Sequence, residues 1–153
     1  MIRNARAVID FDALQHNYRR VRQLVPQSRV MAVIKADAYG HGMLDVARSL
    51  PQVDGFAVAC MNEARVLREA GITAPISVFQ GYQTSDELQQ MAALGLWPVI
   101  HQHWQIDMLE AQTLPAKLAV WLKVDTGMGR LGISSEQAAG CWQRLGTCRQ
   151  VSR

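Results

Sequence analysis

The stretch VMAVIKADAYGHG, residues 30–42, places an unusual group of residues at the end of an apolar run. Five apolar residues, Val30 to Ile34, are typical of a buried strand. Lys35 follows directly, and a tyrosine, a histidine and two glycines come within the next seven residues. Because water normally keeps a lysine amine at the surface, its place at the end of a core strand needs an explanation.

Strand and helix patterns alternate along the chain on both sides of this stretch. Helical spacing of apolar residues predicts a first helix over 12–24, with Asp10 or Asp12 as its N-cap. Apolar runs predict strands at 30–34, 55–60, 75–80, 96–102 and 117–124. Further helices are predicted at 43–50, 62–70, 85–94, 104–112 and from Ser134, where residues 134–137 read as a capping box.

The alternation indicates a parallel sheet with helical crossovers, with about twenty-odd residues in each cycle. The strands are runs of Val, Ile, Ala and Leu, which is typical of parallel strands buried on both faces. Two architectures fit: an open doubly wound sheet, or part of a (β/α)₈ barrel, which typically takes about 250 residues. In both, functional residues gather at the carboxyl ends of the strands, where Lys35, Lys123 and Asp125 lie.

Length and composition are those of an ordinary globular domain. The chain has 153 residues, of which 49% are hydrophobic and 19% charged, so residues 1–153 are expected to form one domain. Its net charge is +3 and its basic residues are scattered, which favours neither nucleic acid nor a membrane surface as a partner. No apolar run resembles a secretory leader or a membrane span, and three cysteines without CxxC spacing predict reduced thiols in the cytoplasm.

Two interpretations of Lys35 remain open on the residues alone. The side chain can lie along apolar surface while its amine reaches water. Alternatively, a desolvated amine can form a Schiff base with a carbonyl. Nearby glycines allow close backbone approach, and the Tyr39 hydroxyl can donate to a phosphate oxygen. An amine beside a phosphate site favours pyridoxal phosphate, which carries both a phosphate and an aldehyde.

A second stretch, LKVDTGMGRLG at residues 122–132, follows the last predicted strand. Its three glycines match the dinucleotide-binding pattern G-x-G-x-x-G. We reject that interpretation because the match falls in the fifth strand–helix unit and no ribose-binding acid follows convincingly. Two interpretations remain: a glycine-rich connection, or a loop in which Lys123 and Asp125 hold Arg130 against an anion. The planar donor fork of an arginine suits a carboxylate or a phenolate oxygen.

Together, AVIKADAYGHG and KVDTGMGRLG resemble the two signatures of the alanine racemases, which are fold-type III pyridoxal-phosphate enzymes. PISVFQGY, residues 75–82, is similar to a strand between them. The resemblance covers essentially the whole chain. It implies the N-terminal part of a TIM-type barrel without the family's β-rich C-terminal domain. It also implies interconversion of L- and D-alanine, which supplies D-alanine for peptidoglycan, by a homodimer in the bacterial cytoplasm.

The resemblance assigns a role to each residue that matches a signature. Lys35 is expected to form the cofactor aldimine and to act as one of two racemisation bases. Tyr39 is expected to hydrogen-bond the cofactor phosphate. Arg130 is expected beside the pyridine hydroxyl and the substrate carboxylate, and Lys123, often carbamylated in this family, is expected to position Arg130. Asp37 departs mildly from the pattern, since many members have Asn there.

Family members have a longer chain than this one. The sequence ends near the expected sixth strand, before the later phosphate loops, an arginine that faces the pyridine nitrogen, and the tyrosine that a partner subunit supplies as the opposite base. We therefore expect residues 1–153 alone to racemise alanine poorly or not at all. Five strands also leave two open sheet edges. The alternative is a non-catalytic pyridoxal-phosphate-binding or assembly fragment.

Several remaining residues are expected to have structural roles. His101 and His103 have H-x-H spacing, but a polar surface is favoured over a metal site, and no metal is expected. Glu63 and Arg65 are expected on a solvated helix face. Core and helix packing is predicted for the four tryptophans: Trp97, Trp104, Trp121 and Trp142.

Overall fold

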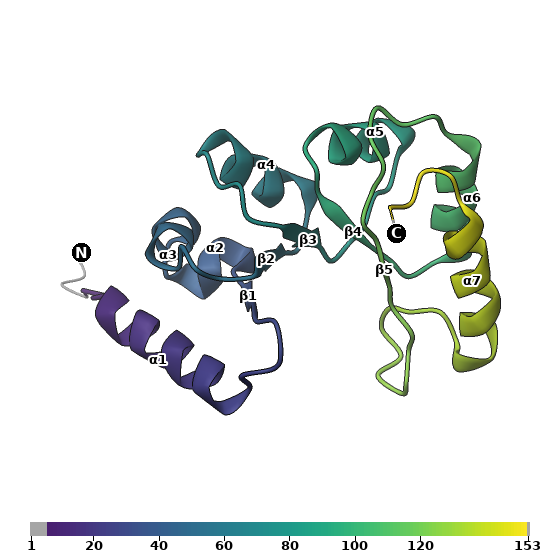
Figure 1. Cartoon of the computed structure of the whole chain (residues 1–153). Helices are drawn as coiled ribbons and strands as arrows, with labels where there is room; N and C mark the ends of the chain where they lie inside the picture. The colour runs from purple at the N-terminus through teal and green to yellow at the C-terminus, as the bar shows by residue number, and fades with distance from the viewer. Residues whose placement is uncertain (1–5, 153) are drawn as a thin grey trace, which may run out of the picture.

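The computed structural model describes residues 6–152, which alternate strands and helices as predicted (Figure 1). The strands are β1 Met31–Val33, β2 Gly55–Val58, β3 Ile76–Val78, β4 Trp97–Ile100 and β5 Trp121–Leu122. The helices are α1 Phe11–Leu24, α2 Lys35–Gly40, α3 Met43–Ser49, α4 Met61–Glu69, α5 Ser85–Ala93, α6 His103–Ala111 and α7 Ser135–Thr147. Within residues 6–152, no helix combines the length and apolar character needed to span a bilayer.

The order of the strands decides between the two predicted architectures. All neighbouring strands are parallel, and their order in the sheet is their order in the chain, β1-β2-β3-β4-β5. A doubly wound sheet reverses its strand order at a switch point, and this sheet has no reversal. With crossovers of one hand, a sequential order places the helices on one face, and α3, α4 and α5 lie together on one side of the strands in Figure 1. The sheet is therefore wound like a barrel wall.

The core lies between this helical layer and the sheet. Every residue of β2 and β3 is buried, which confirms the prediction for these central strands. The prediction is wrong for the two edge strands, because Val33 on β1 is 41% exposed and Trp121 on β5 is 48% exposed. The physical reason is that, among residues 6–152, no helix covers the second face of the sheet. Side chains of the edge strands that point to that face reach solvent.

Local signals fix several helix ends. Asp10 caps α1 by accepting from the backbone N–H of Ala13 at 3.0 Å, as predicted. Gly71 and Gly95 follow α4 and α5 with positive φ, the conformation that commonly ends a helix. The capping box predicted for α7 is wrong, because Ser134 occupies the N-cap position without accepting a helix N–H. Its hydroxyl instead donates to the side-chain oxygen of Gln137 at 3.4 Å.

The fifth strand is shorter than the predicted range 117–124. Only Trp121 and Leu122 pair with β4. On one side of them, Leu118 pairs in parallel with Val151, which follows α7 and so continues the sequential strand order. On the other side, Val124 pairs with Ile133 and closes the loop that carries the second sequence motif. The flanking residues of the predicted strand therefore pair with later parts of the chain.

Candidate functional site

The segment after β1 has a left-handed backbone. Ala36, Asp37, Ala38 and Tyr39 have φ values of 51°, 53°, 52° and 56°, so α2 winds opposite to an ordinary helix. For residues other than glycine, this conformation costs about 1–2 kcal/mol each, or roughly 4–8 kcal/mol for four. Strain of this size persists only where surrounding contacts hold it. Lys35 is the residue that leads into this strained turn.

Two carboxylates hold the turn, one from α4 and one from within the turn itself. Glu63, on α4, accepts from the backbone N–H of Ala36 and of Ala59, each at 2.7 Å. Asp37 accepts from the backbone N–H of Met43 at 2.7 Å, where α3 begins. The prediction that Glu63 lies on a solvated helix face is therefore wrong. Its side chain turns back from the first turn of α4 toward the ends of β1 and β2.

Lys35 is half-buried and Tyr39 is exposed at the carboxyl end of β1. The Lys35 amine lies 5.9 Å from the centre of the Tyr39 ring. At this distance the ring face attracts the ammonium group. The amine is thus placed over the turn that follows its own strand, and the Tyr39 side chain is open to solvent beside it.

A second loop closes over the carboxyl end of β5. One carboxylate oxygen of Asp125 accepts from the backbone N–H of Gly127 at 3.0 Å and of Gly129 at 3.1 Å. These hydrogen bonds, with that from Gly127 the largest cause, lower the pKa of Asp125. The prediction that Asp125 holds the Arg130 side chain needs correction, since its carboxylate is used on the loop backbone. Arg130 is exposed on the loop so formed.

One of the three glycines of this loop, Gly132, is required by a close approach of the backbone. Its φ is +136°, and a Cβ at this position would lie 2.5 Å from the Asp125 backbone nitrogen. The loop returns so close to its own start that only glycine fits. Gly132 therefore has a structural role in closing this loop.

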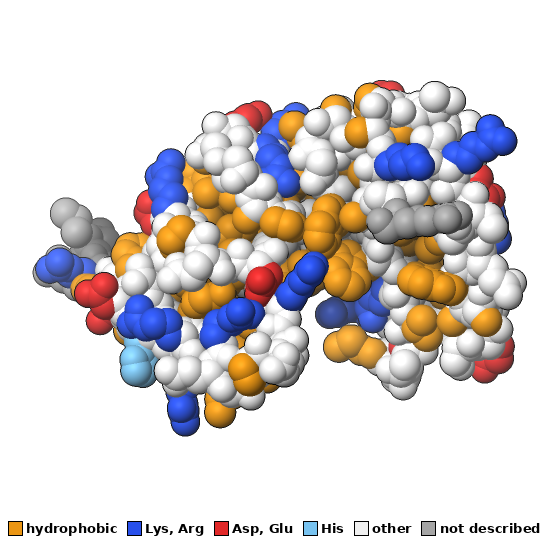
Figure 2. Space-filling view, viewed as in Figure 1, with side chains coloured by type: hydrophobic (Ala, Val, Ile, Leu, Met, Phe, Trp, Pro, Cys, Tyr) orange, Lys and Arg blue, Asp and Glu red, His pale blue; other side chains and the backbone are white. Residues whose placement is uncertain are grey.

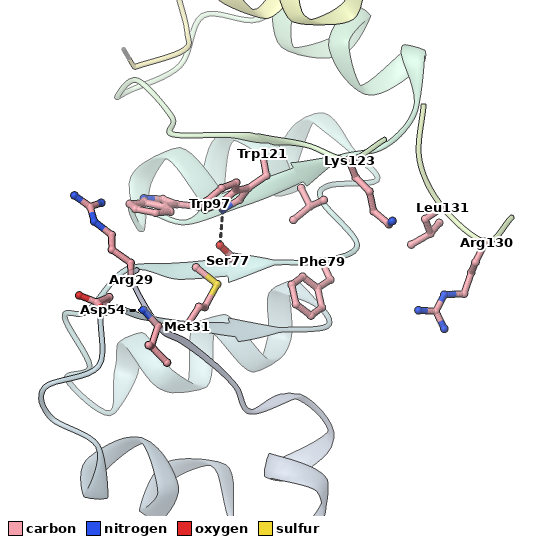
Figure 3. Close-up of a pocket in the computed structure, with 12 residues that line it drawn as sticks. Arg29, Met31, Asp54, Ser77, Phe79, Trp97, Trp121, Lys123, Arg130 and Leu131 are labelled. Atoms are coloured by element: carbon pink, nitrogen blue, oxygen red, sulfur yellow. Dashed lines mark hydrogen bonds between the residues drawn. The ribbon is translucent and has the colours of Figure 1, made fainter. Parts of the chain in front are cut away.

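The uncovered face of the sheet contains a cavity of about 520 Å³. Figure 2 shows hydrophobic side chains on this face beside a notch between the loop after α1 and the loop after β5. The lining is aromatic in the middle and charged toward the ends (Figure 3). It consists of Arg29, Val30, Met31, Asp54, Ser77, Phe79, Trp97, Val99, Trp121, Lys123, Arg130 and Leu131.

The cavity brings together only part of the predicted site. Lys123 and Arg130 both line it, and in Figure 3 the Lys123 amine extends toward the loop of Arg130. Lys35 and Tyr39 lie at the same carboxyl rim but follow β1, at the opposite edge of the sheet from β5. The two sequence motifs therefore share one rim, and the structure places them at the two ends of it.

The tryptophans were not all predicted correctly. Trp97 and Trp121 line the cavity with their rings 6.2 Å apart. Trp142 is 67% exposed on α7, so the prediction of packing is wrong for Trp121 and Trp142. Trp104 is partly exposed but packs edge-to-face on Tyr82. An alternation of polar and apolar residues along β5 could have predicted that Trp121 is exposed. With only two residues in the strand, no such alternation can be recognised.

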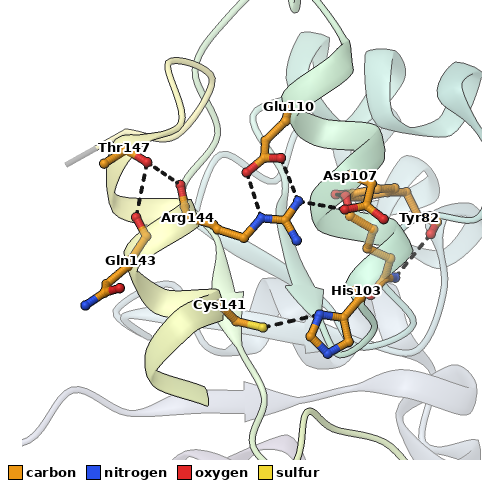
Figure 4. A network of polar contacts seen from close by, with 9 residues as sticks. Tyr82, His103, Asp107, Glu110, Cys141, Gln143, Arg144 and Thr147 are labelled. Carbon is orange, nitrogen blue, oxygen red and sulfur yellow. Dashed lines mark hydrogen bonds and ion pairs between the residues drawn. The ribbon is translucent and has the colours of Figure 1, made fainter. Parts of the chain in front are cut away.

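Of the two histidines, His101 differs from prediction and exposed His103 agrees with it. His101 is buried, not on a polar surface, and its Nε2 lies 3.1 Å from the Gln80 carbonyl oxygen. His103 is exposed, and its Nδ1 lies 3.6 Å from the Cys141 Sγ (Figure 4). Among residues 6–152, no cluster of three or more His, Cys, Asp and Glu side chains could hold a metal ion. Near His103, α6 and α7 are joined by ion pairs of Arg144, on α7, with Asp107 and Glu110, on α6 (Figure 4).

Comparison with known proteins places this geometry in a family. The family model described as alanine racemase, N-terminal domain, matches residues 9–153. The chain belongs to this alanine racemase family. An alanine racemase of Thioalkalivibrio sulfidiphilus is 55% identical over 154 residues, which cover 99% of this chain and 43% of that protein. An alanine racemase of Xylella fastidiosa is 48% identical and is covered over 41% of its length.

Solved alanine racemase structures have the same fold. The biosynthetic alanine racemase of Pseudomonas aeruginosa matches with a TM-score of 0.89 and 36% identity, over 94% of this chain and 40% of that one. The alanine racemase of Acinetobacter baumannii matches with a TM-score of 0.83 and 34% identity, over 91% and 42%. The open sheet is thus part of the TIM-type barrel of alanine racemases. The chain spans about two fifths of the length of these relatives.

Proposed function

We propose that this chain carries the cofactor lysine of an alanine racemase, with Lys35 binding pyridoxal phosphate and alanine as the substrate. The observation that carries the proposal is the left-handed turn at Lys35, a strained segment at the carboxyl rim of a barrel wall in a chain of this family. Strained backbone is found preferentially at active sites and ligand clamps. The carboxyl rim is also where barrel enzymes place their catalytic residues.

The donor groups at this rim fit pyridoxal phosphate. Lys35 offers an amine for the aldehyde, Tyr39 an exposed phenol for the phosphate, and Arg130 a guanidinium for the ring oxygen or a carboxylate. When bound, the cofactor spreads negative charge from the substrate α-carbon into its ring. In this proposal Lys35 attaches the cofactor and then moves a proton at the α-carbon on one face.

Lys123 is proposed to position Arg130. Both line one cavity, and as cations they repel each other at close range. A carbamate on the Lys123 nitrogen would reverse that repulsion, because its oxygens accept from the guanidinium. Asp125 supports the same loop from its backbone side through Gly127 and Gly129. In this proposal Asp125 holds the loop backbone and Lys123 orients the Arg130 side chain.

The base for the opposite face of the substrate is proposed to come from outside residues 1–153. Of the three tyrosines, Tyr18 donates to the Gln52 carbonyl at 2.9 Å, and buried Tyr82 donates to the Gln105 carbonyl. Burial raises the pKa of Tyr82, which further disfavours it as a base. Tyr39 lies next to Lys35, on the cofactor side in this proposal. A bacterial cytoplasmic homodimer that supplies D-alanine to peptidoglycan is the setting we propose.

A non-catalytic assembly or cofactor-binding role is the second candidate. It is favoured by the open edges at β1 and β5 and by the cavity on the uncovered sheet face. Unlike the racemase, such a fragment needs neither Arg130 nor Lys123 for its function.

A chimera separates the two candidates. Residues 1–153 replace the matching segment of the Thioalkalivibrio sulfidiphilus enzyme, and D-alanine formation from L-alanine is measured with added pyridoxal phosphate. We expect the chimera to racemise alanine and Lys35→Ala to lower the rate by about 10²–10⁴-fold or more. Lys117→Ala, at an exposed lysine away from the rim, is the matched control. A folded chimera that binds cofactor but forms no D-alanine would favour the non-catalytic role.

A further inference from the structure

We propose that Glu63 is a positioning residue for Lys35, because its carboxylate holds the left-handed turn to the neighbouring β/α unit. This inference rests on the proposed function in one respect: Lys35 is taken as the cofactor lysine. The hydrogen bonds that carry it are independent of any cofactor.

The carboxylate of Glu63 joins two units of the barrel wall. Its two oxygens accept from backbone N–H groups at 2.7 Å, one from Ala36 and one from Ala59. Ala36 directly follows Lys35, and Ala59 directly follows β2. Hydrogen bonds to an ionised acceptor are shorter and stronger than neutral ones, and these distances are at the short end of the usual range.

The position of this contact matters because the sheet ladder ends just before it. Ile34 donates its N–H to the Ala57 carbonyl at 2.9 Å, which is the last bond between these two segments before the turn. Beyond Ile34 the backbone leaves the sheet and becomes left-handed. Glu63 therefore supplies the link between the two units at the point where the ladder no longer does.

The arrangement requires both oxygens of a carboxylate. A glutamine side chain has one oxygen that can accept and one NH₂ group that can only donate. It therefore loses the hydrogen bond to Ala36 or the one to Ala59. An aspartate keeps the charge at the start of α4 but is one CH₂ shorter, so it cannot bridge Ala36 and Ala59 in this geometry. A role confined to the start of α4 predicts something different. Glu63 would then matter only through its bond to Ala59, just before the N-cap Cys60, and its loss would leave Lys35 in place.

The test compares Glu63→Gln and Glu63→Asp with Glu69→Gln, which removes an exposed carboxylate from the same helix. The first readout is amide hydrogen exchange without cofactor. We expect exchange at Ala36 and the turn to rise about tenfold or more in both Glu63 variants, with β2 protected as in the parent chain. Glu69→Gln is expected to leave the turn unchanged. If the Ala36 amide of Glu63→Asp exchanges as slowly as in the parent chain, the proposal is overturned. This holds even if Glu63→Gln loosens the whole of α4.

The second readout is the reaction of Lys35 with pyridoxal phosphate. The adduct is trapped with borohydride and quantified by peptide mass spectrometry, with Lys117 as the exposed reference amine. We expect Glu63→Asp to lower labelling of Lys35 relative to Lys117 by about tenfold or more, since misplaced groups react far more slowly. Unchanged relative labelling in a folded variant would overturn the positioning role. If the parent labels Lys35 no faster than Lys117, the proposed function fails, and the exchange data still decide on the clamp.

Discussion

The indole N–H of Trp121 donates to the Ser77 hydroxyl at 2.8 Å, across the intervening strand β4 (Figure 3). Ser77 is 1% exposed and sits in the middle of β3, so its hydroxyl needs a protein partner. Trp121 provides it although the indole itself is 48% exposed. The contact ties the short edge strand β5 to the centre of the sheet on the face opposite the helical layer.

This contact predicts a stability difference between two exposed tryptophans. Trp121→Phe keeps an aromatic ring but leaves the buried hydroxyl unpaired, at a cost of about 1–3 kcal/mol. Trp142→Phe, on the solvent side of α7, is the control and is expected to stay within about 0.5 kcal/mol. Urea unfolding of both variants measures the difference. Equal midpoints would show that the Ser77 contact contributes nothing.

Two glycines are expected to respond oppositely to the same substitution. Gly132→Ala places a Cβ 2.5 Å from the Asp125 nitrogen at a φ of +136°, so the loop that carries Arg130 must open. Gly140→Ala adds a Cβ in open space within α7, where alanine is favoured over glycine by about 0.8–1.0 kcal/mol. Thermal unfolding should fall for the first variant and rise for the second. The account of the loop fails if Gly132→Ala is as stable as the parent.

The Asp125 loop is expected to respond to acid. Hydrogen bonds from Gly127 and Gly129 lower the pKa of Asp125 below its unfolded value of about 3.9. Because the folded pKa is depressed, the contribution of the carboxylate is present above the unfolded pKa and is lost as pH falls through the folded one. An NMR titration of the Asp125 carboxyl carbon should therefore have its midpoint below that of a model peptide.

Asp125→Asn provides the control for this titration. The amide keeps an oxygen acceptor for the loop N–H groups but cannot titrate. The chemical shifts of Gly127 and Gly129 should then lose their acid-dependent change. Shifts that still move in the variant would assign the transition to another group.

Asp37 is expected to tolerate asparagine. Asp37→Asn keeps an oxygen that accepts from Met43, and asparagine also enters left-handed backbone readily, so stability should change by less than about 0.5 kcal/mol. Asp37→Ala removes the acceptor and should cost about 0.5–2 kcal/mol, as loss of a helix-capping side chain does. Chemical denaturation of the two variants distinguishes them. A cost for asparagine equal to that for alanine would indicate that the charge, not the hydrogen bond, is what matters.

Apolar runs and cap residues predicted the five strands and every helix except α2, because both signals are local, although β5 is shorter than its apolar run. The parallel pairing also followed from the alternation of elements. The sequential strand order did not, since it depends on how successive crossovers pack rather than on any single residue. The left-handed turn was also missed: alanines at two of its four positions have no intrinsic preference for positive φ.

The candidate site residues were predicted from their position at strand ends and from two motifs. The residues that hold the backbone beside them were not predicted. Glu63 lies on α4, far along the chain from the Ala36 amide that it holds. Its only local sign is its place in the first turn of a helix, where a glutamate often reaches back to the backbone. Trp121 was assigned to the core because the sequence did not reveal which sheet face would lack a helical layer.

The most direct test of the central claim, that Lys35 binds the cofactor, is site-specific trapping in this chain. The chain contains three lysines, Lys35, Lys117 and Lys123, so each can be followed on its own peptide. The protein is incubated with pyridoxal phosphate, reduced with borohydride, digested and analysed by mass spectrometry. We predict that Lys35 carries most of the label and that Lys35→Ala does not transfer it to another lysine. Label mainly on Lys123, with Lys35 unmodified, would contradict the account.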